Sequence, residues 1–392
     1  MHPRKTLTSI ALLGIILFSC SKKDQQVSSG SADPNACVTT TTPKNGEIIE
    51  GRYIVAYNTE AGQSRAMSTE QRQQTSENIL ERNNIAPERL QRTFEGAPGG
   101  FIANLSPDEV VSLKNDHSVA LVEHDRVVSL SNCFTVAEPR LVTWNVTRVG
   151  YGDGTGKTAW IIDTGIDFGH PDLNVDVQRS KNFVDPNGSA TDDNGHGTHV
   201  AGIIAALNNS IGVLGVASGA KVVALKVLGS EGEGSLSAII QALGYINTNA
   251  SAGDVVNMSL GLDTISPILS QQIQNTASRG IYFAIAAGNE HTSASSTSPA
   301  NTNGTNIYTV SAIDSLDNFA PFSNYGNDAV DYAAPGVRIL STYLNGRYAY
   351  MSGTSMAAPH MAGLLLLRGR NVKSSGTAKN DPDGTPDPIA HY

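Results

Sequence analysis

Ser352-Gly353-Thr354-Ser355-Met356-Ala357-Ala358-Pro359 is the stretch around which the rest of the sequence is organised. The apolar run from Ala357 to Leu367 predicts a buried helix that begins near Ser355. The first N–H groups of a helix have no partner inside it, so a helix start here would direct free donors and a partial positive charge at the Ser355 hydroxyl. Ser355 is therefore a candidate nucleophile, although a serine that only caps a core helix would give the same pattern.

A serine hydroxyl is a weak nucleophile at neutral pH and needs a base within hydrogen-bond reach. Two other stretches contain suitable groups. Trp160-Ile161-Ile162-Asp163-Thr164-Gly165-Ile166-Asp167 is an apolar strand that ends in a carboxylate and a glycine turn. His196-Gly197-Thr198-His199-Val200-Ala201-Gly202 places a histidine at the head of a helix of small residues.

In this order the three stretches resemble the motifs of the subtilisin-like serine proteases, whose triad runs Asp, His, Ser along the chain. The resemblance covers residues 141–370. It implies that Asp163 accepts the N–H of His196, and that the other ring nitrogen of His196 takes the proton of Ser355. Asp167 competes for the role of the acid, but it lies in the loop beyond the strand, so we expect Asp163 in that role.

Ala286-Ala287-Gly288-Asn289 predicts a tight strand end, and in the family the corresponding Asn donates to the oxyanion together with the backbone N–H of the nucleophile. Asn257-Met258-Ser259-Leu260-Gly261 and Gly229-Ser230-Glu231-Gly232-Glu233-Gly234 resemble the two rims of the family's substrate cleft. The resemblance implies that a polypeptide binds between the rims as an added strand. The candidate substrate-binding residues are Ser259, Leu260, Gly261, Gly232, Gly234, Ala287 and Gly288.

The pattern of the catalytic region predicts an α/β fold. Near-continuous apolar strands that alternate with helices are typical of a parallel sheet covered on both faces, so we expect a doubly wound, mostly parallel, subtilisin-like sheet. Active sites of such sheets lie at the carboxyl ends of the strands, where Asp163, Ser259 and Asn289 stand. The predicted strands are 158–163, 221–228, 254–260, 281–287 and 307–313.

The segment ahead of this region predicts a small α+β unit of βαββαβ order, residues 47–132. Ser68 and Gln71 form the pattern of a capping box at the start of its first helix. The unit resembles the inhibitor-type propeptide of subtilisin-like enzymes, which implies an intramolecular inhibitor with a ferredoxin-like fold and cleavage between Leu130 and Thr135. An unrelated ferredoxin-like domain is the alternative.

The first 20 residues predict an export signal, because Arg4 and Lys5 precede an apolar segment too short to span a bilayer. Leu17-Phe18-Ser19-Cys20 resembles a bacterial lipobox, so we expect lipid at Cys20 and attachment to a membrane, facing the periplasm or the cell surface; cleavage without lipid, and secretion, is the alternative. Residues 21–46 predict a flexible tether. In an oxidising compartment Cys37 and Cys133 could form a disulfide, but neither must pair.

The remaining expectations concern partners and ions. A formal net charge of −9 and the lack of any basic cluster longer than Lys22-Lys23 argue against a nucleic-acid partner. We expect a monomer with no cofactor for the chemistry; His199 is expected to be a packing residue. Asp331 occupies a position that resembles a calcium ligand of the family, so a structural calcium ion is a further expectation. Residues 133–370 form the predicted catalytic domain, and residues 371–392 predict a disordered tail.

Together the sequence predicts an exported serine endopeptidase made as a self-processing precursor. The alternative is an inactive or self-blocked homologue that acts as a peptide-binding module, because a cleft can persist without turnover.

Overall fold

The computed structural model describes residues 45–58, 67–129, 133–136 and 142–392. The predicted signal peptide with Cys20, and Cys37, lie outside the described residues, and of Cys133 only the backbone is described. All described residues belong to one compact unit. None of the helices in these ranges is both long enough and apolar enough to cross a bilayer.

The N-terminal segment has the predicted βαββαβ order. Its strands form an antiparallel sheet in the order β4-β1-β3-β2, and Ser68 and Gln71 make both hydrogen bonds of the predicted capping box. The elements are β1 (Ile48–Tyr57), α2 (Thr69–Arg82), η1 (Pro87–Arg89), β2 (Leu90–Phe94), β3 (Gly100–Asn104), α3 (Pro107–Lys114) and β4 (Val119–Ser129).

The second segment is built on a ten-stranded sheet in the order β19-β20-β16-β15-β14-β13-β7-β11-β8, with β9 also paired to β11. All of its pairings are parallel except β19 with β20. The prediction of a doubly wound, mostly parallel sheet is confirmed. The strands are β7 (Thr158–Asp163), β8 (Asn174–Val175), β9 (Lys181–Asn182), β11 (Lys221–Lys226), β13 (Val255–Met258), β14 (Tyr282–Ala286), β15 (Ile307–Ile313), β16 (Tyr332–Pro335), β19 (Lys373–Thr377) and β20 (Pro388–His391).

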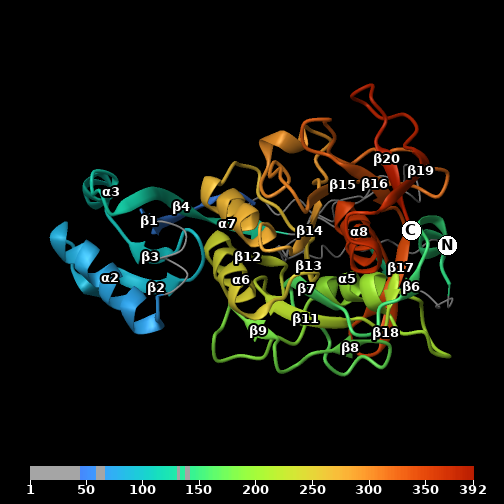
Figure 1. Ribbon diagram of the computed structural model, residues 1–392, viewed down its shortest axis with the longest axis horizontal. Coiled ribbons are helices and arrows are strands. Elements are labelled where there is room, and N and C mark those ends of the chain that lie inside the picture. The colour runs from blue at the N-terminus through green and yellow to red at the C-terminus, as the bar shows by residue number, and fades with distance from the viewer. Residues whose placement is uncertain (1–44, 59–66, 130–132, 137–141) are drawn as a thin grey trace, which may run out of the picture. The chain divides into compact units, whose positions relative to one another are not determined.

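Two hydrophobic cores cover the two faces of this sheet, because neighbouring side chains of a strand point to opposite faces. In β7, Ala159 and Ile161 belong to the core that contains α5 and α8, whereas Trp160 and Ile162 belong to the core that contains α6 and α7. Helices α5 and α8 also pack against each other (Figure 1). The helices are α4 (Trp144–Val149), α5 (His196–Ala205), α6 (Leu236–Asn249), α7 (Pro267–Ala277), α8 (Thr354–Arg368) and η2 (Ala294–Ser296).

Short strands complete the fold around the edges of the main sheet. Strands β6 and β10 form a parallel pair, and β17, β18 and β5 form an antiparallel sheet in that order. Strand β12 adds to the N-terminal sheet beside β4. Their bounds are β5 (Cys133–Val136), β6 (Gly152–Asp153), β10 (Ala217–Ser218), β12 (Glu233–Ser235), β17 (Ile339–Tyr343) and β18 (Arg347–Ser352).

The prediction of a disordered tail over residues 371–392 is wrong. Strand β20 extends the main sheet by pairing Ile389 with Ala333 of β16, and Ile389 is fully buried. Asp387 accepts a hydrogen bond from the Ser311 hydroxyl at 2.6 Å. The Asp- and Pro-rich composition suggested disorder, but one short apolar segment is enough to anchor the end of the chain to a sheet edge.

Candidate active site

The predicted functional residues meet at the carboxyl ends of neighbouring strands. Strands β7, β13 and β14 lie side by side in the sheet. Asp163 is the last residue of β7, Ser259 follows β13, and Asn289 follows β14. The parallel arrangement therefore brings residues far apart in the sequence to one edge.

Asp163 and His196 form a buried pair. His196 is the first residue of α5, and its Nδ1 lies 2.7 Å from Asp163 Oδ1 with both side chains fully buried. A carboxylate can only accept, so Nδ1 carries the proton, and Nε2 of a neutral ring is left as an acceptor. That Nε2 is buried and has no hydrogen-bond partner within the part of the chain that the structure describes. The pair thus presents one unoccupied basic nitrogen.

The two candidates for the acid differ in their surroundings. Asp163 Oδ1 accepts the N–H of Thr164 at 2.7 Å in addition to the imidazole. Asp167 instead accepts backbone N–H groups of Gly169 and Asn345, so it organises loops. This geometry favours Asp163 as the partner of His196.

Ser355 is the second residue of α8 and is 4% exposed. Its Oγ donates to the carbonyl of Ser259 at 3.2 Å, and Ser259 Oγ donates to the carbonyl of Ser355 at 2.7 Å. Oγ therefore points at the strand end in this structure. Helix α8 begins at Thr354, close to the predicted start.

Asn289 is fixed by the residue that precedes Ser355. Its Oδ1 accepts the backbone N–H of Thr354 at 2.8 Å and the Thr354 hydroxyl at 3.0 Å. Because these donors define which end of the amide is oxygen, the NH₂ group faces away from Thr354. Gly288, with φ +107°, permits the tight turn that brings the side chain there.

One predicted rim is paired with the chain's own N-terminal segment. Strand β12 pairs antiparallel with β4, with Gly234 opposite Val128 and Glu233 opposite Ser129. Gly232, at φ +73°, turns the chain into β12. The other predicted rim, Ser259 to Gly261, continues from β13 and carries the contact to Ser355.

A second pairing follows residues 130–132 in the sequence. Strand β5 pairs antiparallel with β18, with Cys133 opposite Ser352, three residues before Ser355. The sequence pattern did not predict this second pairing. The continuation of the N-terminal segment is thus paired close to the candidate nucleophile in the sequence of β18 and α8.

Two carboxylates of β4 contact the starts of helices α6 and α7, and sequence reasoning missed both. Asp125 accepts the backbone N–H of Ser237 at 3.0 Å and its hydroxyl at 2.7 Å. Glu123 accepts the hydroxyl of Ser266, the N-cap of α7, at 2.6 Å, and burial raises the pKa of Glu123 to about 7. The alternation Glu123-His124-Asp125 placed both acids on one strand face, which was the available signal.

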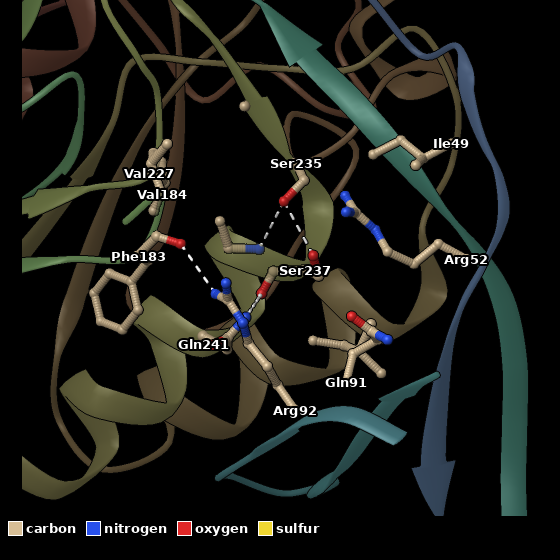
Figure 2. A pocket seen from close by; sticks show the side chains of 13 residues that line it. Ile49, Arg52, Gln91, Arg92, Phe183, Val184, Val227, Ser235, Ser237 and Gln241 are labelled. Atoms are coloured by element: carbon tan, nitrogen blue, oxygen red, sulfur yellow. Dashed lines mark hydrogen bonds between the residues drawn. The ribbon is translucent and has the colours of Figure 1, made fainter. Parts of the chain in front are cut away.

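A cavity of about 280 Å³ lies between β12, α6 and the N-terminal sheet. Figure 2 shows Arg92 pointing to the carbonyl of Phe183, with Ser235 and Ser237 at the start of α6 nearby. None of Asp163, His196, Ser355 or Asn289 lines it. The cavity belongs to the contact between the two segments and is separate from the candidate active site.

Among the described ranges, no group of three or more His, Cys, Asp or Glu side chains could hold a metal ion. Burial lowers the pKa of His199 to about 3, and its Nε2 contacts the carbonyls of Ile339 and Ala349, which fits a packing residue. Asp331 accepts the N–H of Thr309 at 2.8 Å, and burial raises its pKa to about 6. A calcium ion at Asp331 stays a prediction.

Comparisons with known proteins identify a family for each of the two segments. Residues 154–376 match the model of the subtilase family, and residues 52–131 match that of peptidase inhibitor I9. The chain is 38% identical over 328 residues to M-protease of Shouchella clausii (82% of each chain) and 44% identical over 233 residues to Subtilisin BL of Lederbergia lenta (58% of this chain, 83% of the relative).

Two further similar proteins are also named as serine proteases. Alkaline serine exoprotease A of Vibrio alginolyticus is 35% identical over 333 residues, which cover 81% of this chain but only 60% of that relative. A crystal structure of a cold adapted subtilisin-like serine proteinase matches with a TM-score of 0.56 and 32% identity, covering 64% of this chain and 98% of that one.

Proposed function

The chain belongs to the subtilase family of serine proteases and carries an I9 propeptide domain, and from this premise we propose that it is an exported serine endopeptidase that uses Asp163, His196 and Ser355 as its triad. The observation that carries the proposal is the buried pair of His196 and Asp163, 2.7 Å apart, with the outer ring nitrogen left as an acceptor. A histidine held in this tautomer is suited to accept the proton of a serine hydroxyl.

In the proposed reaction Ser355 Oγ leaves the carbonyl of Ser259 and attacks the carbonyl carbon of a peptide bond. His196 Nε2 takes the hydroxyl proton and returns it to the leaving amine as the C–N bond breaks, which leaves an acyl group on Oγ. A water molecule then loses its proton to Nε2 and attacks the acyl carbon, and the proton returns to Ser355. Asp163 stabilises the imidazolium that forms twice in this cycle.

The negative charge on the substrate oxygen needs donors at the site where it forms. We assign this role to the side-chain NH₂ of Asn289 and to the backbone N–H of Ser355. The contact between Asn289 Oδ1 and Thr354 supports the assignment, because it fixes the donor end of the amide relative to Ser355.

The N-terminal domain is proposed to be the inhibitor of its own catalytic domain, with self-cleavage between Leu130 and Thr135. The pairing of β4 with β12 supports this role, because a strand that adds to a cleft rim imitates a bound substrate. The pairing of β5 with β18 supports the same window, because Cys133 lies opposite Ser352, three residues before Ser355. Substrates are proposed to be polypeptides bound in the same way.

The second candidate is a self-blocked or inactive homologue that acts as a peptide-binding module. One observation favours it: strands before and after residues 130–132 pair with the predicted catalytic domain, at β12 and at β18. It differs from the first candidate in what happens after cleavage, since a blocked protein would retain its own strands and turn over no other peptide.

An organophosphonate, which reacts with an activated serine, separates the candidates. We expect one adduct, on Ser355, and hydrolysis of casein by the processed protein. The Ser355→Ala variant should accumulate as a folded precursor that is never cut between Leu130 and Thr135. No adduct on Ser355 would contradict the proposed chemistry, and an adduct without casein hydrolysis would favour the self-blocked protein.

A further inference from the structure

The side chain of Asn324 is fully buried, and within the described ranges its hydrogen bonds go to one loop, residues 287–292, which contains Asn289. Asn324 stands between β15 and β16, directly after Ser323, so it reaches this loop from a different part of the chain. We propose that Asn324 is a positioning residue that holds Asn289 where the oxyanion forms. The inference rests on the role proposed above for Asn289.

The donors of Asn324 hold the beginning of the loop. Its Nδ2 donates to the carbonyl of Ala287 at 3.0 Å and to Glu290 Oε2 at 2.9 Å. Its backbone N–H donates to the carbonyl of Gly288 at 2.9 Å. The residues on both sides of Asn289 are therefore tied to the same residue.

The acceptor of Asn324 holds the end of the loop. Oδ1 accepts the backbone N–H of Glu290 at 3.1 Å and that of Thr292 at 2.9 Å. One amide group thus satisfies carbonyl and N–H groups that a turn would otherwise leave without partners in a buried site. Backbone bonds to the same stretch add to this hold, because the N–H of His291 donates to the carbonyl of Phe322 at 2.9 Å and the N–H of Tyr325 donates to that of Thr292 at 3.1 Å.

The network extends to Asn289 itself. Glu290 Oε2, which accepts from Asn324, also accepts the backbone N–H of Asn289 at 2.9 Å. On its other side Asn289 is held by Thr354. A Cβ on Gly288 would collide with Asn324 Nδ2, so the loop wraps closely around this side chain.

These contacts explain why an amide is required. Asp at position 324 would have the same shape, but it would present oxygen to the carbonyl of Ala287 and a second carboxylate to Glu290. The loop would have to move away from residue 324, and Asn289 would move with it. Since an oxyanion donor acts only within about 2.7–3.1 Å of the developing charge, the displacement should lower kcat and leave KM unchanged.

The test compares Asn324→Asp in two backgrounds of the processed enzyme, with active sites counted by organophosphonate labelling. In the otherwise wild-type enzyme we expect kcat to fall about tenfold or more at constant KM. In an Asn289→Ala enzyme, where no donor is left to position, the same substitution should change kcat less than about twofold. A role that acts through Asn289 must be non-additive with it.

Asn306→Asp is the matched control, because Asn306 is also buried but contacts the carbonyl of Ala277 and the guanidinium of Arg370. It should lower the thermal midpoint without changing kcat per active site. If Asn324→Asp yields no processed enzyme, Asn324→Ser replaces it in both backgrounds, and we expect the same loss of kcat that depends on Asn289. A wild-type kcat in the position 324 variants, or an equal loss in both backgrounds, would overturn the inference. An unchanged kcat in Asn289→Ala alone would overturn the proposed oxyanion role as well.

Discussion

Glu123 should make the folding stability of the precursor depend on pH. In the folded chain burial raises the pKa of Glu123 from an ordinary 4.5 to about 7, against a smaller opposing effect of the Ser266 hydrogen bond. A carboxyl whose pKa is raised on folding stabilises fully below its unfolded pKa and loses that contribution as pH rises through the folded pKa. The loss should therefore extend from about pH 4.5 to about pH 7.

The size of the effect follows from the two pKa values. At about 1.4 kcal/mol per pH unit, the difference between 4.5 and about 7 corresponds to about 3 kcal/mol, or a few hundredfold in an equilibrium constant. Glu123→Gln removes the titration but keeps an oxygen for the Ser266 hydroxyl. The Gln variant should therefore gain about 3 kcal/mol relative to the parent between pH 4.5 and pH 8.

Urea unfolding of the Ser355→Ala precursor, with and without Glu123→Gln, measures this difference without proteolysis. Glu109→Gln is the control, because the Ser106 N–H lowers the pKa of Glu109, the opposite direction to the shift of Glu123. The control should show no change relative to the parent between pH 5 and pH 8. If the Glu123→Gln precursor followed the pH dependence of its parent, the reasoning from burial would be wrong.

Four further outcomes are expected. Asn289→Ala should lower kcat by about 10²–10³, the loss known from the family rather than one derived from this structure, in steady-state kinetics. Activity on a peptide substrate should fall at acid pH, because a protonated His196 cannot accept the proton of Ser355, and a flat profile from pH 5 to 9 would count against a histidine base. Ile389→Ala should cost about 2–5 kcal/mol in urea unfolding of the Ser355→Ala precursor, whereas a disordered tail would show no loss. If Cys20 carries lipid and Cys37 is bonded to Cys133, dithiothreitol should release the processed catalytic chain from membranes and Cys37→Ser should release it without reductant; a free thiol at Cys133 would contradict this.

The sequence was most informative where a local pattern ends in a polar residue. The apolar run that forms β7 ends at Asp163 in both the prediction and the structure, because a strand buried on both faces must be apolar up to its last residue. The helix that carries Ser355 was predicted from its apolar run for the same reason. These elements and their order were enough to predict that Asp163, His196 and Ser355, the candidate acid, base and nucleophile, come together at one sheet edge.

Contacts between distant segments could not be predicted in this way. The alternation of β4 puts Glu123 and Asp125 on one face, but nothing local indicates that this face meets the N-termini of α6 and α7. The side chain of Asn324 is a similar case, since a polar residue in a loop carries no periodic signal. Its role depends on a loop more than 30 residues earlier in the chain.

The N-terminal segment is held in register by its side chains as well as by its backbone. Asp125 of β4 accepts the backbone N–H of Ser237 at the start of α6, and the last residues of the same strand pair with β12 up to Ser129. Pairing with β18 begins again at Cys133. Three residues join the two pairings, so four Cα–Cα steps separate Ser129 from Cys133, and they span at most about 14 Å when fully extended. This short connection supports the proposed self-cleavage between Leu130 and Thr135, because the proposed window begins directly after β4 and ends within a strand that is paired next to the candidate nucleophile.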